Sequence, residues 1–560
     1  MSKKIMALKK ELHDRNFTKF GLDLNLVVSG LSALLLIGFA IYAFLNLDRA
    51  SEQLNQIKGM VLERFDTVFI FSANLFIVAL IVLAFTKAGK IRLGGTDAKP
   101  EFSKFSWYAM LMSAGMGIGL MFWSVGEPIY HVAVTPIFQS DNAIQSALAT
   151  TFFHWGIHPW AIYGIISLAL AYFTFNKKLP LSPRSFFYPI FKERIFGLLG
   201  DVIDTLAVLA ALAGLATSLG LGVQQINSGL SHIFGIPTSI VIQVVLIAGI
   251  TLIATASVVS GIDKGVKFLS ELNIKAAFIL MMIVLIVGPT FKIIGDIFGA
   301  TGLYITGFVD ASLNVNQYDA SWAQGWTIFY WAWWISWSPF VGMFIAKISK
   351  GRTVREFITA VLFVPTILSI IWLGIFGSTA LHVDAATAGA VTDAVNSNLS
   401  IALFEMIQLI NAPFFSDIIK LIVNILAVFL VVTFFVTSSD SGSLVVDSLA
   451  SGGKIKSPVG QRIFWALMEG FIAAVLLIIG GEQALSILQT AVITTGLPFA
   501  IIITIVTVVL FYELLLKKQV DIKPEPVLTV DKQVSNTMDK KGTGHQSRQS
   551  KVDDFGTETI

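Results

Sequence analysis

Long apolar stretches, separated by short polar connections, dominate the sequence. A stretch of about 20 apolar residues is long enough to cross a bilayer as a helix. The chain contains twelve such stretches, at residues 25–47, 66–87, 105–127, 144–173, 201–231, 238–260, 270–295, 322–348, 356–381, 416–449, 462–481 and 484–516. We number them spans one to twelve. The pattern predicts an all-α polytopic membrane protein with twelve transmembrane helices.

The remaining segments complete the predicted domain organisation. Residues 1–24 form a mixed polar N-terminal segment, residues 25–516 form the transmembrane domain, and residues 517–560 form a tail rich in Ser, Thr, Gln and Lys. A segment with so few apolar residues cannot bury enough surface to fold, so we expect the tail to be disordered. Residues 295–315, between spans seven and eight, are expected to lie on the outer surface of the membrane.

Basic residues are distributed unevenly between the connections. Lysine and arginine precede span one and follow spans two, four, six, eight, ten and twelve, whereas residues 128–143, 297–321 and 382–415 contain neither. Cytoplasmic connections of membrane proteins carry an excess of Lys and Arg. The sequence therefore predicts that both termini lie in the cytoplasm.

Composition narrows the classes of function. Charged residues make up 13% of the chain, about half of the value for soluble domains. The absence of cysteine excludes disulfides and thiolate chemistry, and a net charge of +3 without a long basic run gives no support for nucleic-acid binding. An enzyme is not indicated, because the seven histidines are scattered. A channel is not indicated either, because no repeated filter motif occurs.

Two spans contain residues that weaken a helix. In span three, Gly115, Gly117 and Gly119 alternate over five residues. In span eight, residues 336–339 read Ser-Trp-Ser-Pro, and a proline inside a helix removes a backbone donor. Close helix packing is the alternative explanation for the glycines, but it usually places them four apart on one face. Because unwound backbone at membrane depth survives only beside a cavity, we expect both interruptions to border a binding site.

The positions of these two spans predict an internal repeat. Spans three and eight occupy corresponding places in two five-helix units, spans 3–7 at about 105–295 and spans 8–12 at about 322–516. An odd number of helices gives the two units opposite topology. Broken helices at matching positions of inverted repeats mark the midplane site of secondary transporters. The sequence therefore predicts a leucine-transporter-type 5+5 inverted repeat, preceded by two N-terminal helices.

Span eight also concentrates indole side chains. Trp331, Trp333, Trp334 and Trp337 fall within seven residues. The indole face is the best side-chain partner for a cation that has no N–H to donate. An interfacial aromatic belt is the alternative, but a belt needs no helix breaker. We therefore interpret the segment as part of a cage for a quaternary ammonium group.

Several segments together resemble the betaine/choline/carnitine transporter family over nearly all of residues 25–516. The most specific is the stretch 331–355, and the glycine run at 115–119, the Glu127-Pro128 pair, the aromatic residues of span four and residues 434–440 also match. The resemblance implies the leucine-transporter-type fold, often as a homotrimer. It further implies a location in the bacterial cytoplasmic (inner) membrane, in contact with lipid, and no cofactor.

The resemblance also implies a substrate site. It places the substrate in an aromatic box formed by spans four and eight, with Trp155, Trp160, Tyr163, Trp333, Trp334 and Trp337 along its path. The unwound amides of Gly115, Gly117 and Gly119 would hold a carboxylate, since half-helix N-termini favour anions. In choline carriers of this family the position of Gly119 typically holds Asp, which favours a zwitterion such as glycine betaine for this chain. Glu127 and Pro128 are expected to form a cap or gate at the outer end of span three.

Sodium is the coupling ion that the resemblance implies. The implied ligands are the carbonyls of Ser113, Met116 and Phe434 and the hydroxyls of Thr437 and Ser438. The alternative for the two hydroxyls is bonding to carbonyls of their own helix. Sodium-independent exchangers of the family hold an Arg from span five in place of sodium, whereas residues 201–230 contain no Arg or Lys. We therefore expect sodium-coupled import of glycine betaine as an osmoprotectant, with a carnitine/betaine exchanger or a choline transporter as alternatives.

Overall fold

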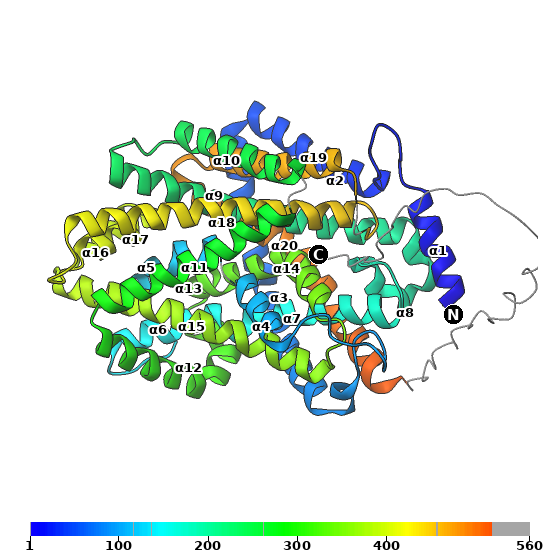
Figure 1. Ribbon diagram of the computed structural model, residues 1–560, viewed down its shortest axis with the longest axis horizontal. Helices are drawn as coiled ribbons and strands as arrows, with labels where there is room; N and C mark the ends of the chain where they lie inside the picture. The colour runs from blue at the N-terminus through cyan, green and yellow to red at the C-terminus, as the bar shows by residue number, and fades with distance from the viewer. Residues whose placement is uncertain (1, 116, 136, 261–262, 455–456, 518–560) are drawn as a thin grey trace, which may run out of the picture. The chain divides into compact units, whose positions relative to one another are not determined.

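Helices account for nearly all of the computed structural model, which describes residues 2–115, 117–135, 137–260, 263–454 and 457–517 (Figure 1). The first part contains α1 (Ser2–Asp14), α2 (Leu26–Leu45), α3 (Leu47–Phe85), η1 (Lys87–Lys90), α4 (Lys104–Gly115), α5 (Ile118–Ala133), α6 (Ala143–Trp155), α7 (Ile157–Ala171), η2 (Tyr172–Asn176), η3 (Pro183–Phe187), α8 (Tyr188–Phe191) and η4 (Lys192–Phe196). The middle part contains α9 (Leu198–Phe234), α10 (Ile240–Ser260), α11 (Asp263–Val287), α12 (Thr290–Tyr318), α13 (Ala320–Ala323), η5 (Gln324–Ile328) and α14 (Phe329–Ile348). The last part contains α15 (Val354–Ala386), α16 (Ala390–Ser397), η6 (Leu399–Ile401), α17 (Ala402–Leu409), α18 (Asp417–Ala450), α19 (Val459–Gly480), η7 (Gly481–Gln483), α20 (Ala484–Phe511) and η8 (Tyr512–Leu516).

The number of candidate membrane spans differs from the predicted twelve. By length and composition, the described residues contain ten, or eleven when the bent pair α4 and α5 counts as one span. α12 meets these criteria although the sequence placed residues 295–315 on the membrane surface, and the aromatic α14 does not meet them. Val459–Leu516 is counted once, but Gly481 has a φ of +51° and α19 packs against α20. The chain therefore turns at Gly481 between two helices.

One of the two predicted helix breaks is absent. α14 runs without interruption through Pro339, contrary to the expectation for residues 336–339. A proline at this position leaves the carbonyl of Ile335 without its usual backbone donor. The Ser338 hydroxyl donates to that carbonyl at 2.7 Å. The side chain thus replaces the missing N–H and keeps the helix regular. The other break is present, because α4 ends at Gly115 and α5 begins at Ile118 with a bend of 61°.

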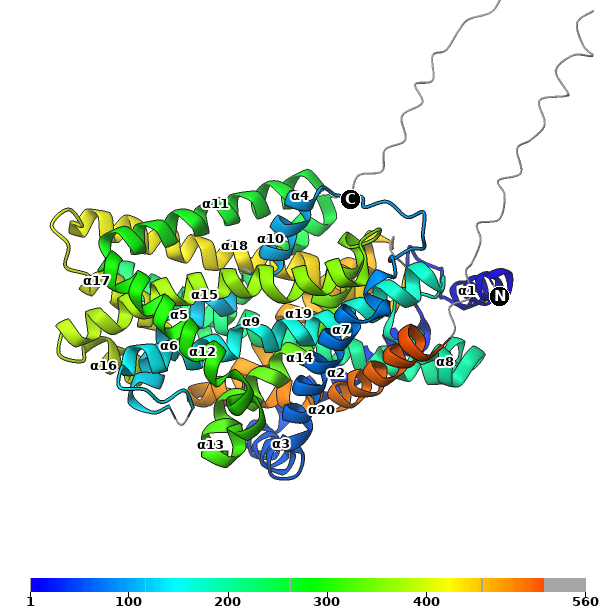
Figure 2. The same ribbon diagram turned by 90° about the horizontal axis from the view of Figure 1, so that it is seen from below.

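The main helix pairs show a regular exchange. α9 lies along α18, and α10 lies along α19 (Figure 1). The exchange replaces the helices α5, α7, α9, α10 and α11, in that order, by α14, α15, α18, α19 and α20, and replaces the second set by the first. Under this exchange, most pairs of helices that pack together become other pairs that pack together. α5–α15 becomes α14–α7, α5–α18 becomes α14–α9, and α11–α18 becomes α20–α9. Figure 2 shows α11 along α18. The packing of α14 on α20 is a departure from this exchange.

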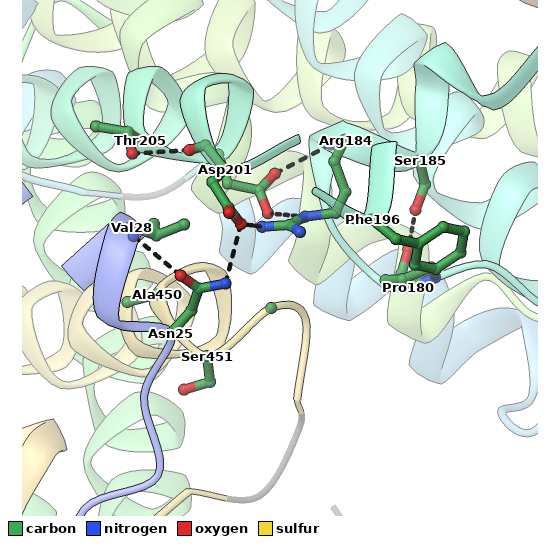
Figure 3. Close-up of polar contacts among 12 residues, drawn as sticks. Asn25, Val28, Pro180, Arg184, Ser185, Phe196, Asp201, Thr205, Ala450 and Ser451 are labelled. Atoms are coloured by element: carbon green, nitrogen blue, oxygen red, sulfur yellow. Dashed lines mark hydrogen bonds and ion pairs between the residues drawn. The ribbon is translucent and has the colours of Figure 1, made fainter. Parts of the chain in front are cut away.

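A buried ion cluster fastens the connection between α7 and α9 to the rest of the bundle. Arg184 lies in η3 and donates to Asp204 Oδ2 at 2.6 Å and to Asp201 Oδ1 at 2.8 Å, both carboxylates being on α9 (Figure 3). The same Asp201 oxygen accepts from Asn25 Nδ2 at 2.9 Å. Asn25 caps α2, and its backbone N–H donates to the carbonyl of Ala450 at the end of α18. Four segments far apart in sequence therefore share one polar cluster.

Candidate functional site

A small cavity of about 50 Å³ lies where the α4–α5 break meets α7 and α14. Its size is sufficient for a few water molecules. Its walls come from several helices, with the residues Ala114, Gly115, Gly117, Ile118, Gly119, Leu120, Trp155, Pro159, Trp160, Tyr163, Ser218, Trp333, Trp334, Trp337 and Ser369. The structure therefore brings all nine residues of the expected substrate site to one cavity. Among the described residues, the lining contains no Lys or Arg, and the large side chains that face the cavity are mostly aromatic.

The indole rings on one side of the cavity contact one another directly. Trp333 and Trp334 stack with ring centroids 4.9 Å apart and planes 12° apart. Trp155 meets Trp334 edge to face at 4.9 Å. Trp160 meets Tyr163 edge to face at 5.4 Å, and Tyr163 lies 6.3 Å from Trp334. Both faces and edges of these rings are thus presented around the same small space.

The three alternating glycines have different surroundings. A Cβ at Gly115 would lie 2.8 Å from Trp160 Cζ2, and a Cβ at Gly119 would lie 2.9 Å from Trp155 Cη2. Real Cβ atoms do not approach other atoms this closely, so the two glycines allow the indoles to reach the backbone. A Cβ at Gly117 would meet no described atom within 4 Å. The extended backbone of Gly117 ends the break and precedes the first free amides of α5.

The hydrogen bonds of the cage indoles fix their orientation. Trp333 Nε1 donates to Ser218 Oγ at 3.2 Å, and Trp334 Nε1 donates to the backbone carbonyl of His154 at 3.1 Å. Trp337 is half-buried and packs edge to face on Phe340. Its Nε1 has no partner among the described residues. No hydrogen bond to a described residue therefore fixes the orientation of Trp337.

Glu127 lies at the centre of a polar cluster behind the cage, and not at a helix end as the sequence suggested. α5 continues past it to Ala133, and its side chain is fully buried. Its carboxylate accepts from Trp155 Nε1 at 2.7 Å and from the Tyr330 hydroxyl at 2.5 Å. His154 Nδ1 lies 2.7 Å away, and His131 Nε2 lies 3.4 Å away. His131 and His154 are scattered in the sequence, but the fold brings both to the same carboxylate.

The cluster is a feature that the sequence analysis missed. Glu127, His131 and His154 present ligand atoms within 4.8 Å of one another. Both oxygens of the carboxylate are already engaged by Trp155, Tyr330 and His154, and His154 Nε2 pairs with the Thr327 hydroxyl at 3.0 Å. Two signals pointed to Glu127 without predicting the cluster. One is its position in an apolar span, where an ionisable residue is a functional candidate, and the other is the match of the Glu127-Pro128 pair to the family.

The expected sodium ligands are placed as follows. The Thr437 hydroxyl donates to the carbonyls of Thr433 at 3.0 Å and Phe434 at 3.3 Å, and it accepts from Asn273 Nδ2 at 3.4 Å. Ser438 is the next residue of α18 and is half-buried. Ser113 lies in α4, which packs mainly on α15 and α14. Met116 lies outside the described residues. The structure therefore joins Phe434 with Thr437, in the arrangement that the alternative explanation of the hydroxyls predicts.

Comparison with known proteins finds one family across nearly the whole chain. A family model described as "BCCT, betaine/carnitine/choline family transporter" matches residues 27–519. The chain is 48% identical to Glycine betaine transporter 1 of Vibrio parahaemolyticus over 495 residues, which cover 87% of this chain and 93% of that protein. It is 47% identical to a glycine betaine/proline/choline/ectoine transporter of the same organism, covering 88% of both chains. It is 42% identical to a glycine betaine transporter of Acinetobacter baylyi, covering 80% of this chain and 67% of that protein.

Proposed function

Since the chain belongs to the betaine/carnitine/choline transporter family, whose members are membrane transporters and not enzymes, we propose that it imports glycine betaine together with sodium. The observation that supports this best is the cavity at the α4–α5 break, whose described lining residues include several indole rings and no basic side chain. Aromatic faces attract a trimethylammonium group without needing hydrogen bonds. Imported glycine betaine would serve as an osmoprotectant.

The carboxylate end of glycine betaine gives the helix break a role. A zwitterion carries a carboxylate whose charge must be balanced, and no Lys or Arg occurs in the part of the lining that the structure describes. The first N–H groups of α5, beginning at Ile118, have no partners within the helix and carry partial positive charge. They border the same cavity as the indoles. Backbone amides at one end and ring faces at the other suit glycine betaine.

Sodium coupling is part of the proposal. The carbonyl of Phe434 and the hydroxyls of Thr437 and Ser438 would supply ligands from α18, with the carbonyls of Ser113 and Met116 from the region of the break. An exchanger would use a basic side chain in place of sodium, but residues 201–230 of α9 contain neither Lys nor Arg. A hard monovalent cation suits such uncharged oxygen ligands.

We extend the proposal to the architecture. We propose twelve spans, with a 5+5 inverted repeat after two N-terminal helices. The exchange of helix pairs supports the repeat, and the turn at Gly481 supports counting α19 and α20 as two spans. The single break in the first unit and the regular α14 in the second make the two units unequal. The basic connections favour cytoplasmic termini in the bacterial inner membrane. We also expect a homotrimer surrounded by lipid.

The test is uptake by the purified protein in liposomes. Labelled glycine betaine should accumulate above its outside concentration when an inward sodium gradient is imposed, and not with potassium in its place. Proline, ectoine, carnitine and choline serve as competitors. If uptake does not depend on sodium and occurs only when the liposomes are preloaded with substrate, the protein is an exchanger and the proposal is wrong.

A broader substrate range is the second candidate. The relative at 47% identity is named for glycine betaine, proline, choline and ectoine. If choline is transported better than betaine by the unaltered protein, the choline transporter alternative is the correct one.

A further inference from the structure

We propose that Glu127 is a positioning and specificity-determining residue of the aromatic cage. In this proposal its buried carboxylate fixes the rings that receive the substrate and provides the negative charge that makes the cage selective for a quaternary ammonium. The inference rests on the proposed function, because it concerns the same cavity.

The carboxylate holds one cavity-lining indole and one ring that packs behind the cavity, from two different helices. Oε2 accepts from Trp155 of α6 and from Tyr330 of α14. Tyr330 stacks on Trp334 with centroids 5.7 Å apart and planes 20° apart. Oε1 faces His154 Nδ1, and the backbone carbonyl of His154 accepts from Trp334 Nε1. The orientations of Trp155 and Trp334 therefore both depend on one side chain outside the cavity lining.

The surroundings of Glu127 are those of an ionised carboxylate. The indole N–H of Trp155 can only donate, and the Tyr330 hydroxyl donates to the same oxygen. His154 Nδ1 lies 2.7 Å from the other oxygen, and His131 Nε2 lies 3.4 Å from it without forming a hydrogen bond to any described residue. Donors that meet an anion form shorter and stronger bonds than neutral pairs. Glu127 is fully buried, so its charge acts on the cavity with little screening by water.

The charge also explains the direction in which a zwitterion would lie. Ile118 starts α5 beside the cavity, and Glu127 lies nine positions later on the same helix. At 1.5 Å per residue the two are separated by about 13 Å along the helix axis. The helix thus places free amides near one end of the substrate and a carboxylate beyond the other. Both features favour the ammonium group on the indole side of the cavity.

The experiment compares two ligands of equal shape in the full-length protein. Glycine betaine carries a trimethylammonium group, whereas 3,3-dimethylbutanoate carries a tert-butyl group and the same carboxylate. Dissociation constants of both are measured by quenching of tryptophan fluorescence, for the unaltered protein and for Glu127→Gln. The matched control is Glu469→Gln, because Glu469 is equally buried in α19 and bonds Ser439 rather than a cage residue.

The proposal predicts that Glu127→Gln weakens betaine binding by about tenfold or more. Binding of the tert-butyl ligand should fall much less, because that ligand loses only the fixed rings and not the charge. Glu469→Gln should leave the ratio of the two dissociation constants unchanged. An equal loss for both ligands would show a purely structural role and overturn the inference. If the unaltered protein binds neither ligand, the proposed function fails instead.

A second variant keeps the inference testable if Glu127→Gln does not fold. Tyr330→Phe removes one donor and leaves the carboxylate charge less compensated. The preference for betaine over the tert-butyl ligand should then be retained or increased, although both ligands bind more weakly because the rings are less well fixed. Loss of the preference in Tyr330→Phe would contradict the role of the charge.

Discussion

At the scale of single residues, the proposed function depends on ring faces that meet at one cavity. The sequence predicted these aromatic residues of the cavity, because Trp333, Trp334 and Trp337 recur within five residues and the resemblance supplied Trp155 and Tyr163. It could not predict Glu127 as the common partner of Trp155 and Tyr330, since these contacts join residues 28 and 203 positions apart. Such pairings follow from tertiary packing and leave no local pattern.

Trp334 is expected to contribute strongly to substrate binding, because its ring stacks on Trp333 and meets Trp155 at the cavity. Trp334→Leu should weaken betaine binding by about 2 kcal/mol, or about 30-fold, and Trp334→Phe should weaken it less. Binding and uptake in liposomes are the measurements. Trp465→Leu removes a buried indole of α19 outside the cavity and controls for loss of packing. An unchanged apparent affinity in Trp334→Leu would show that the cage is elsewhere.

Gly119 is expected to control the choice between zwitterion and cation. A carboxylate introduced there would attract choline and repel the carboxylate of betaine. The side chain must displace Trp155 and Trp333, whose Cη2 atoms lie 2.9 Å and 3.0 Å from a Cβ at this position. We expect Gly119→Asp to increase choline uptake relative to betaine, with a lower overall rate. Gly119→Asn has the same size without the charge, and an equal gain of choline uptake in this variant would refute the explanation.

At the scale of helices, local sequence identified breaks without showing which of them persist. The glycine run does separate α4 from α5, because glycine weakens a helix. Pro339 does not interrupt α14, because the adjacent Ser338 bonds the carbonyl that the proline leaves free. A proline is thus an incomplete predictor when a hydroxyl residue precedes it.

Ser338→Ala should destabilise α14 by about 1 kcal/mol, because the Ile335 carbonyl would be buried without a donor. Thermal unfolding in detergent measures this as a lower melting temperature. Ser167→Ala is the matched control in α7, where the hydroxyl bonds the Tyr163 carbonyl at 2.6 Å in a turn without proline. Equal melting temperatures for the two variants would mean that Ser338 does not compensate for Pro339.

α18 carries the proposed sodium ligands, so removing their hydroxyls should lower the apparent sodium affinity more than the maximal rate of uptake. Thr437→Ala and Ser438→Ala each remove one oxygen, and the apparent sodium affinity should fall several-fold while uptake at saturating sodium changes less. Sodium titrations of betaine uptake provide the measurement. Thr433→Ala, one turn earlier, removes a hydroxyl that bonds the Phe429 carbonyl at 2.9 Å and should leave the sodium affinity unchanged. Identical titrations for all three variants would place the ion elsewhere.

At the scale of the whole molecule, apolar length and basic connections predicted a polytopic helical membrane protein, and the family comparison agrees. The sequence could not give the number of spans with certainty, because α12 is apolar enough to pass as a span while α14 is too rich in aromatic and polar residues. The sequence could not predict the helix pairs either, because pairing depends on which faces of the helices meet. A buried helix such as α9 has apolar residues on all sides, so its hydrophobic pattern does not identify one contact face.

The cluster around Arg184 should stabilise the whole bundle. Arg184 and Asp204 are both buried, and removing one partner of a buried ion pair costs about 3–5 kcal/mol. Arg184→Met is therefore expected to lower the melting temperature strongly, without changing the betaine affinity of the protein that remains folded. Arg15→Met breaks a pair with Glu11 that is more than half exposed, and it should have little effect. Similar losses in both variants would show that the buried cluster contributes no more than a surface pair.

The contact between Trp333 and Trp334 has a consequence for the transport cycle. The two indoles cover each other's faces at 4.9 Å, so each ring has an apolar partner that does not depend on the substrate. A carrier that performs net uptake must return without substrate, whereas a strict exchanger returns only with substrate bound. Rings that are paired with each other suit the return without substrate that the proposed sodium-coupled uptake requires.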